Sequence, residues 1–323
     1  MPGGMHELGV SRRTLHGTYD RDAAPLITIE PGDHVRLATL VSSWRLDREG
    51  RTFSPRDSER DRGHALTGPI GIRGVRPGDM LAIHVETVRP ASWGESGAGG
   101  GAWGLNREMG LQDAPFLRML WELDRDRGTA TNSLGQSVRM APFMGVMGMP
   151  ADVPGLQPTR PPGINGGNID CRELVAGSTL YLPVAVDGGL FSIGDGHAAQ
   201  GDGEVGGIAI ECSMERVELT FDVVPDPPIR SAYAKTPAGL ITFGFDEDLD
   251  RAAAIALDAM LDLTVAQGLF PDRLHALSVA TVVVDLRITQ MVNQVRGVHA
   301  LLASDAFVGT EAWRTHGGWR NGG

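Results

Sequence analysis

Residues 217–223 read Val-Glu-Leu-Thr-Phe-Asp-Val, so every second residue of this stretch is apolar. The same alternation occurs in residues 81–86, Leu-Ala-Ile-His-Val-Glu. A period of two is typical of a β-strand with one face buried and the other in water. Pro-Gly-Asp occurs at residues 31–33 and 77–79, each time just before such an alternation, as expected of a β-turn that leads into a strand. These stretches predict a chain built mainly of β-strands.

Glycine is unusually frequent, at 44 of the 323 residues. Helices tolerate glycine poorly, so strands and turns are expected over the first two thirds of the chain. Helical spacing of apolar residues begins after Asp246 and ends at Gly268, and Asp272 can open a second helix that reaches about Val279, before a strand over 282–288. We therefore expect an α+β fold, mainly β, with sandwich-like or barrel-like sheets and a C-terminal α/β portion.

The proline-dense segment 154–162 indicates an ordered linker and, more weakly, a domain boundary near residue 160. This boundary would separate a mainly β domain, 1–160, from a second domain, 161–323, that holds an acidic site loop and the C-terminal helices. One intertwined unit is the alternative. The glycine-rich run 97–104 is expected to form a mobile loop or a lid.

The charge balance disfavours a nucleic-acid partner. Lys and Arg number 29 and Asp and Glu number 40, so the net charge is 29 − 40 = −11, and an acidic protein repels nucleic-acid phosphates.

Cys171 and Cys212 are too few for a disulfide framework and are expected to be buried packing residues. Apolar runs are too short for a membrane span and the N-terminus lacks the profile of a signal peptide, so a cytoplasmic protein is expected.

Polar residues are densest in the run 194–204, Gly-Asp-Gly-His-Ala-Ala-Gln-Gly-Asp-Gly-Glu, which is expected to form a loop between two strands. Between Arg172 and Arg216 there is no Lys or Arg, but there are seven acids: Glu173, Asp187, Asp195, Asp202, Glu204, Glu211 and Glu215. Clustered carboxylates need a cation or raised pKa values, and a mixture of Asp and His favours zinc or another first-row divalent ion over calcium. The alternative is a set of hydrated turns, because Gly-Asp-Gly is a common turn sequence.

A second polar group lies on the glycine-rich turn 161–170 and contains Asn165, Asn168 and Asp170. In turns, such side chains usually bond to their own backbone. Outside the run 194–204, the histidines show no zinc-binding spacing. Among them only His64, just before Leu-Thr-Gly-Pro at 66–69, is retained as a candidate site residue.

Taken together, these stretches resemble the acetamidase/formamidase family. The residues that carry the resemblance are 66–70 (LTGPI), 76–79 (RPGD), 166–170 (GGNID), 177–184 (GSTLYLPV) and 194–204. The resemblance extends from about residue 31 to residue 302. It implies a hydrolase that cleaves the C–N bond of a short-chain linear amide, such as formamide or acetamide, to a carboxylate and ammonia. It also implies a mainly β fold, a divalent metal and a cytoplasmic homo-oligomer, a dimer or larger.

The resemblance also implies roles for individual residues. Three are implied as metal ligands: Asp170, Asp195 and His197. Glu204 is implied as the general base, and His64 would orient the substrate or donate a hydrogen bond to the oxyanion. The residues that would support them, or contact the substrate, are Asn168, Gln200 and Asp202. In the alternative assignment Glu204 is a fourth ligand and Asp202 is the base.

Other functions can be weighed against the same residues. Amidases with a Cys-Glu-Lys or Ser-Ser-Lys site need a catalytic lysine, and Lys235 is the one lysine of the chain, within Ala-Tyr-Ala-Lys-Thr, away from any glycine- and serine-rich stretch. The non-catalytic alternative is a metabolite-binding β-protein whose acidic loop holds a structural calcium ion. A metal-dependent amide hydrolase remains the favoured hypothesis.

Overall fold

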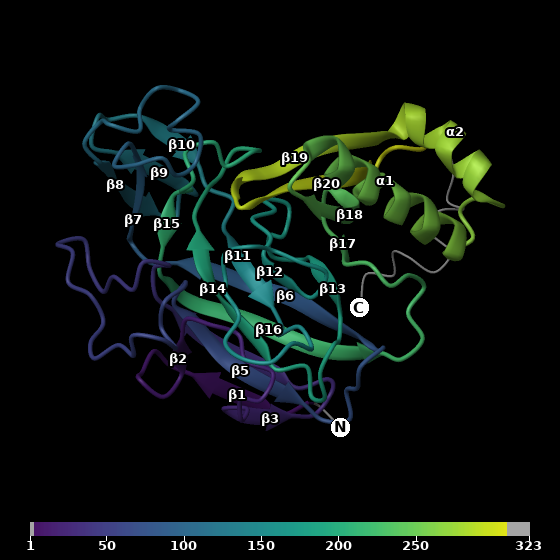
Figure 1. The fold of residues 1–323 in the computed structure, drawn as a ribbon, viewed down its shortest axis with the longest axis horizontal. Coiled ribbons are helices and arrows are strands. Elements are labelled where there is room, and N and C mark those ends of the chain that lie inside the picture. Colours follow the sequence, from purple (N-terminus) through teal and green to yellow (C-terminus); the bar gives the residue numbers. More distant parts are fainter. Residues whose placement is uncertain (1–2, 309–323) are drawn as a thin grey trace.

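The computed structural model describes residues 3–308, and these form two β-sheets and two helices (Figure 1). The first sheet has nine strands. In spatial order they are β1 (Met5–Leu8), β4 (His34–Thr39), β16 (Met214–Val224), β6 (Met80–Pro90), β13 (Thr179–Pro183), β17 (Tyr233–Lys235), β18 (Gly239–Asp246), β20 (Val295–Ala303) and β19 (Val284–Asn293).

The second sheet has eleven strands. Its main path is β10 (Ser137–Arg139), β9 (Thr129–Asn132), β8 (Leu117–Asp124), β7 (Trp93–Ala98), β15 (Glu211–Cys212), β14 (Phe191–His197), β11 (Phe143–Gly148) and β12 (Gly166–Asn168). Off this path, β5 (Leu66–Ile72) pairs with β14, with β2 (Leu15–His16) and with β3 (Ile27–Ile29). Both sheets draw strands from both sides of residue 160, and we infer that the chain folds as one intertwined unit.

The two strands predicted most directly from their alternation, β6 and β16, are neighbours in the first sheet. They run antiparallel, with Leu219 opposite Val85 and Phe221 opposite Ile83. The turns predicted at 31–33 and 77–79 lead into β4 and β6. Both strands are confirmed. Buried and less buried residues alternate along the middle of β16, whereas the first four residues of β6 are all buried.

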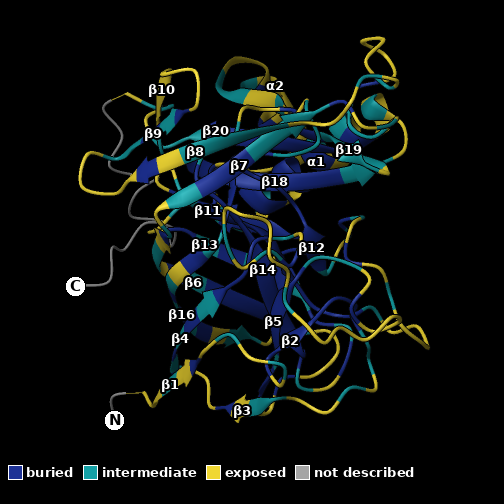
Figure 2. Cartoon of the chain, turned by 90° about the vertical axis from the view of Figure 1, so that its left-hand side faces the viewer, coloured by how far each residue is buried: buried dark blue, intermediate teal, exposed yellow. Residues whose placement is uncertain are grey.

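The main hydrophobic core lies between the two sheets. It combines apolar residues of β4, β6 and β16 from the first sheet with residues of β5, β11 and β14 from the second. Phe191 of β14 and Phe221 of β16 meet edge to face across this core, with ring centroids 5.2 Å apart. The strands at the centre of the molecule are buried, whereas exposed residues concentrate in loops (Figure 2). The predicted mainly β, sandwich-like fold is confirmed.

The two C-terminal helices lie where the apolar spacing predicts them. α1 (Leu249–Ala266) begins after Asp248, whose carboxylate accepts a hydrogen bond from the Arg251 amide, and α2 (Arg273–Val283) begins after Asp272 in the same way. α1 packs against β18 and β20, and a Cβ atom at Gly244 would lie 2.0 Å from the carbonyl oxygen of Ala252. Within residues 3–308, neither helix combines the length and the apolar character that a bilayer span requires.

The expected loop over 194–204 is wrong in its first half. Residues 194–197 belong to β14, which is buried throughout and pairs with β11, β15 and β5. The glycines of this segment serve close strand packing, because a Cβ at Gly194 would lie 2.4 Å from the Ala65 carbonyl oxygen. The second strand expected beside this loop is short and begins only at Glu211, since β15 contains only Glu211 and Cys212.

Candidate metal centre

Three of the predicted ligands, Asp170, Asp195 and His197, meet inside the second sheet. Asp195 and His197 are two positions apart on β14, so their side chains leave the same face of the strand. Asp170 follows the end of β12, on the other side of β11. Each residue offers a ligand atom, and these atoms all lie within 4.8 Å of one another. The geometry can hold a metal ion.

Gly145 of β11 leaves the space in which these side chains meet. A Cβ atom at this position would lie 2.6 Å from Oδ1 of Asp170, 2.7 Å from Oδ2 of Asp195 and 2.9 Å from Cε1 of His197. Real Cβ atoms essentially never approach that closely. Any side chain at position 145 would therefore occupy the space where the ligand atoms meet. Sequence reasoning missed this residue.

Glu204 and Glu211 form a second possible metal-binding group with His197. Glu211 belongs to β15 and pairs in register with His197; its Oε2 accepts a hydrogen bond of 2.7 Å from the Ser42 hydroxyl. Sequence reasoning counted Glu211 among the acids but did not predict it as a site residue. A carboxylate between Ile210 and Cys212, in a stretch without Lys or Arg, was the signal that could have identified it.

Gln200 determines how the His197 ring presents its nitrogens. Gln200 Nε2 donates to the Asp170 carbonyl oxygen at 2.8 Å, so its Oε1 accepts, and His197 Nδ1 must donate to it at 2.9 Å. His197 Nε2 then faces Oε1 of Glu211 at 3.0 Å and Oδ1 of Asp195 at 3.3 Å. An unprotonated nitrogen opposed to two carboxylates requires a proton or a metal cation between them.

Burial and mutual repulsion shift the pKa values of these acids. Burial, together with the charges of Glu211 and Asp195, raises the pKa of Glu204 to about 8 against the opposing effect of His197. Burial and the charge of Asp195 raise the pKa of Glu211 to about 7, and burial with the charges of Glu204 and Asp195 raises the pKa of Asp170. Burial lowers the pKa of His197, but the charges of Glu211 and Asp195 outweigh it and raise that pKa well above its usual value.

Five buried polar atoms of this cluster lack a hydrogen-bond partner among residues 3–308. They are Oδ1 of Asn168, Oδ1 of Asp170, Oδ1 of Asp195, Nε2 of His197 and Oε2 of Glu204. All five can supply a lone pair, and buried polar atoms are normally paired. A divalent cation would satisfy several of them at once, and the oxygen and imidazole donors suit zinc or a similar ion.

The backbone at the cluster is strained. Asp170, Asp195 and Glu204 have positive φ angles of 54°, 60° and 44°, and they make up half of the six non-glycine residues with positive φ in the part of the chain described. Residues are held in this region only where surrounding structure enforces it, and such strain is frequent at functional sites. The fold holds the three carboxylates in these conformations.

A cavity of about 490 Å³ opens beside the cluster. Asp195, Glu204 and Glu211 line it, and so do two further predicted residues, His64 and Asn168. Nδ1 of His64 lies 2.8 Å from the hydroxyl of Thr159. Burial lowers the pKa of His64 despite the nearby charge of Asp195, which favours the neutral imidazole. The structure therefore brings His64 and Asn168 to the same cavity as the acids.

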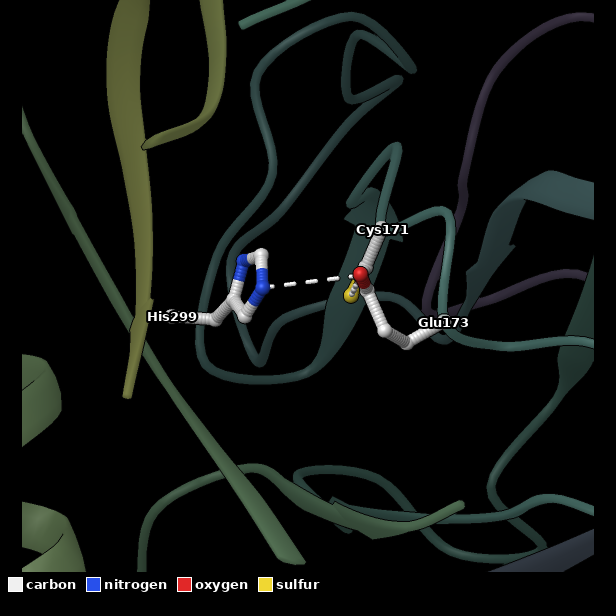
Figure 3. Close-up of side chains that lie close together, drawn as sticks. All are labelled: Cys171, Glu173 and His299. Atoms are coloured by element: carbon white, nitrogen blue, oxygen red, sulfur yellow. Dashed lines mark hydrogen bonds and ion pairs between the residues drawn. The ribbon is translucent and has the colours of Figure 1, made fainter. Parts of the chain in front are cut away.

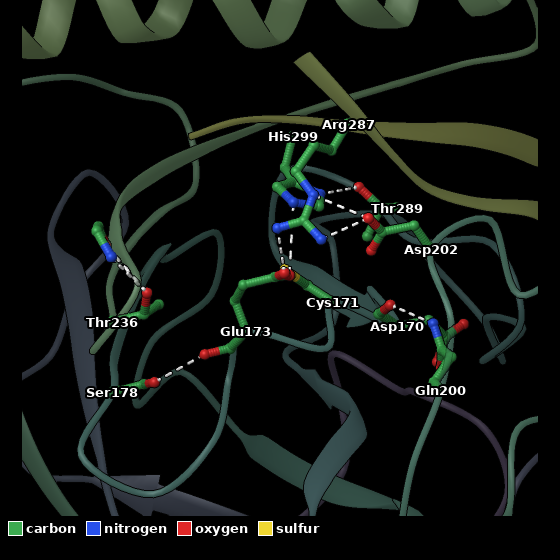
Figure 4. Close-up of polar contacts among 11 residues, drawn as sticks. Asp170, Cys171, Glu173, Ser178, Gln200, Asp202, Thr236, Arg287, Thr289 and His299 are labelled. Atoms are coloured by element: carbon green, nitrogen blue, oxygen red, sulfur yellow. Dashed lines mark hydrogen bonds and ion pairs between the residues drawn. The ribbon is translucent and has the colours of Figure 1, made fainter. Parts of the chain in front are cut away.

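Asp202 is the predicted residue that the structure does not bring into the cluster. Its Oδ2 accepts from Arg287 of β19, and Nη1 of Arg287 lies 2.6 Å from Oε1 of the buried Glu173 (Figure 4). Arg287 thus joins the loop of Glu204 to the segment that follows Asp170. Its position was not apparent from the sequence, because β19 lies far along the chain.

Cys171, Glu173 and His299 form a third buried group that could hold a metal (Figure 3). Cys171 Sγ donates to Glu173 at 3.3 Å, and Nε2 of His299 lies 3.5 Å from the same carboxylate oxygen. Burial and the charge of Glu173 raise the pKa of the Cys171 thiol well above its usual value. Arg287 already balances the charge of Glu173, so this group does not need a metal ion for that purpose. Both cysteines are free and buried, as predicted.

Comparison with known proteins adds the evolutionary relationship. The model of the acetamidase/formamidase family matches residues 6–157 and 151–238. A formamidase of Methylophilus methylotrophus is 28% identical over 244 residues, which cover 59% of this chain and 59% of the relative. The chain thus spans less than two thirds of that relative's length.

Solved structures of similar proteins agree with the fold. The acetamidase of Bacillus halodurans superposes with a TM-score of 0.79 at 26% identity, over 92% of this chain and 97% of the other. The acetamidase of Yersinia enterocolitica superposes with a TM-score of 0.81 at 26% identity, over 94% and 93%. Because the family model covers more than half of the sequence, the chain belongs to the acetamidase/formamidase family.

Proposed function

We propose that this protein is a metal-dependent hydrolase that cleaves the C–N bond of a short-chain linear amide to give a carboxylate and ammonia. The observation that carries the proposal is the buried group of acids and one imidazole, with unpaired lone-pair atoms, beside a cavity. Membership of the family supports the same reaction class.

Asp170, Asp195 and His197 would hold the divalent ion, and zinc suits this donor set best. When bound, such an ion polarises the amide carbonyl and makes water more acidic. Gln200 keeps the proton of His197 on Nδ1 and so leaves Nε2 free to act as a ligand. Oε1 of Glu211 lies 3.0 Å from the same nitrogen, so Glu211 would either bind the ion as a further ligand or balance its charge from nearby.

Glu204 would move the proton. Its Oε2 has no partner among the described residues, and it lines the cavity in which an amide would bind. Its carboxylate takes a proton from the attacking water and returns it to the amide nitrogen, which must be protonated as the C–N bond breaks. Burial raises the pKa of this carboxyl, which favours its taking up a proton.

His64 would stabilise the oxyanion. The Thr159 hydroxyl accepts from the His64 backbone amide at 3.0 Å and has one proton to donate to Nδ1 of the ring. A neutral His64 then carries its proton on Nε2, which can donate to the oxygen of the tetrahedral intermediate. Asn168 would orient the amide from the same cavity.

Metal analysis and an ammonia assay on the full chain test the proposal. We expect zinc or another first-row metal in the purified protein, and ammonia release from formamide or acetamide that stops with a chelator and returns with metal. Calcium without zinc, together with no ammonia from any amide, would favour a metabolite-binding protein instead. We also propose a homo-oligomer, which light scattering on the same sample measures.

A further inference from the structure

The cavity beside the proposed metal centre is large for the smallest amides. Its volume of about 490 Å³ lies in the range of roughly 300–1,000 Å³ in which proteins bind ligands much larger than acetamide. Formamide or acetamide would leave most of this space to water. The side chains around the remaining space therefore indicate which kind of acyl group the substrate carries.

One wall of the cavity is aromatic and apolar. Trp103 and Phe116 line it with ring centroids 5.8 Å apart, and Phe116 is 45% exposed. The glycine run expected to be a lid makes room for Phe116: a Cβ at Gly97 would lie 2.6 Å from its ring. Within residues 3–308, nearly half of the Phe116 side chain is thus left uncovered and open to a ligand.

This wall adjoins the proposed proton carrier. Gly207, in the turn that follows Glu204, approaches Trp103 so closely that a Cβ would lie 2.9 Å from the indole. The Gly207 amide donates to the Glu204 carbonyl oxygen at 2.7 Å. An acyl chain that lies along Trp103 and Phe116 would therefore have its amide end close to Glu204.

Another part of the lining is cationic. Arg62 and Arg160 both line the cavity, both are exposed, and neither forms an ion pair within residues 3–308. Their segments lie side by side, because the Thr159 hydroxyl bonds to both the amide and the ring of His64. Nε of Arg62 donates to the Glu59 carbonyl oxygen at 3.2 Å, but neither guanidinium has a carboxylate partner among the described residues. In a chain with a net charge of −11, two such groups beside one cavity are suited to bind a carboxylate.

We infer that the preferred substrate is a primary amide whose acyl part is an apolar spacer, aliphatic or aromatic, that ends in a carboxylate. This inference rests on the proposed amide hydrolysis. In the reaction the oxygen of water forms a bond to the carbonyl carbon, the C–N bond breaks, and the nitrogen leaves as ammonia. The product is a dicarboxylate, and no oxidant, reductant or further co-reactant is needed.

Matched pairs of amides test the inference on the metal-loaded full chain. Succinate monoamide is compared with butanamide, and terephthalate monoamide with benzamide, with formamide and acetamide as references. We expect kcat/KM to be about tenfold or more higher for the anionic member of at least one pair, since charge-assisted hydrogen bonds to arginine are strong. Added salt should reduce this preference, because both guanidinium groups are exposed to solvent.

The double variant Arg62→Gln/Arg160→Gln tests the cationic lining directly. We expect its kcat/KM for the anionic amide to fall about tenfold, and the ratio between anionic and neutral amides to approach one. The control is Arg76→Gln, which removes an exposed arginine that does not line the cavity and should leave the ratio unchanged. A double variant that keeps the wild-type ratio overturns the assignment of these arginines.

The outcomes separate the two proposals. One outcome is that formamide and acetamide release ammonia, but kcat/KM for the larger anionic amides is equal to or below that for their neutral partners. This result overturns the present inference and leaves the proposed amide hydrolysis intact. No ammonia from any amide of the panel, with metal bound, overturns the proposed function and this inference together.

Discussion

Gly145 lies so close to Asp170 that a Cβ atom at position 145 would come within 2.6 Å of the Asp170 Oδ1 atom. The backbone of Gly145 has no positive φ angle, so alanine is tolerated by the strand itself. Gly145→Ala should therefore disturb the ligand cluster and leave the sheet intact. We expect metal content and ammonia release to fall at least tenfold, with an unchanged far-ultraviolet circular dichroism spectrum.

Gly163→Ala is the matched control, since a Cβ there would meet no heavy atom within 4 Å and the φ angle is again ordinary. It should retain both metal and activity. Full metal content and wild-type turnover in Gly145→Ala would contradict the convergence of Asp170, Asp195 and His197 on one ion.

A second prediction concerns His197 and Gln200. His197→Ala should strip the metal or weaken its binding strongly, because it removes the imidazole ligand. Gln200→Met retains the bulk of the side chain but loses the bond to Nδ1, and it should weaken metal affinity by roughly 10- to 100-fold, the usual effect of removing such a partner. Titration with a metal-sensitive dye measures both affinities. A His197→Ala variant with full metal content and wild-type turnover would exclude His197 as a ligand.

The alternation in residues 81–86 and 217–223 predicted β6 and β16 correctly because the apolar side chains of both strands pack into the core between the sheets. The helices were also predictable, because Asp248 and Asp272 bond to the first turn of each helix through local contacts. The assignment of residues 194–197 to a loop was wrong for a physical reason. Glycine permits both tight turns and close strand packing, and only the neighbouring strands distinguish the two.

The candidate site was predictable where its residues are close in sequence, as with Asp195, His197 and Gln200. Gly145, Glu211 and Arg287 depend on strand pairing between distant segments, which local patterns do not specify. Asp202 illustrates the converse: its position beside Glu204 in sequence suggested a shared role, but its carboxylate turns toward Arg287. Spacing along the chain identified the acids but not the direction of each side chain.

A third prediction concerns proton transfer by Glu204. Glu204→Gln is nearly isosteric but cannot accept a proton, so it should retain the metal and lose roughly 10²-fold or more in kcat. Asp202→Asn is the control, because Asp202 is paired with Arg287 outside the cluster, and it should change kcat only slightly. If Glu204→Gln loses its metal while Asp202→Asn keeps the metal and loses turnover, Glu204 is a ligand and Asp202 is the base.

A fourth prediction concerns the link that Arg287 makes between Asp202 and Glu173. Arg287→Met leaves the carboxylate of Glu173 buried without its cation, whereas Asp202→Asn removes only the more exposed partner. We expect Arg287→Met to lower the free energy of unfolding by roughly 2 kcal/mol, between the values typical of exposed and of buried ion pairs. Asp202→Asn should cost less. Urea denaturation measures both, and equal losses would contradict the burial argument.

The last prediction concerns pH and the buried His16 of β2. Nδ1 of His16 bonds to the carbonyl oxygen of Thr18 at 2.7 Å, and Nε2 lies 3.0 Å from the hydroxyl of Ser192. Burial lowers the pKa of His16 to about 4, although the bond to Thr18 opposes this shift. In the unfolded chain the pKa is near 6.5.

Between these two pH values His16 binds more protons in the unfolded chain than in the folded chain. The stability contributed by neutral His16 is therefore complete above about pH 6.5 and is lost as the pH falls toward 4. The loss should reach roughly 3 kcal/mol. Carboxylates titrate in the same range, so the measurement is the difference between wild type and His16→Gln in urea denaturation at successive pH values. The variant should lose less stability on acidification than the wild type does. Parallel curves for the two proteins would show that His16 is protonated equally in the folded and unfolded states.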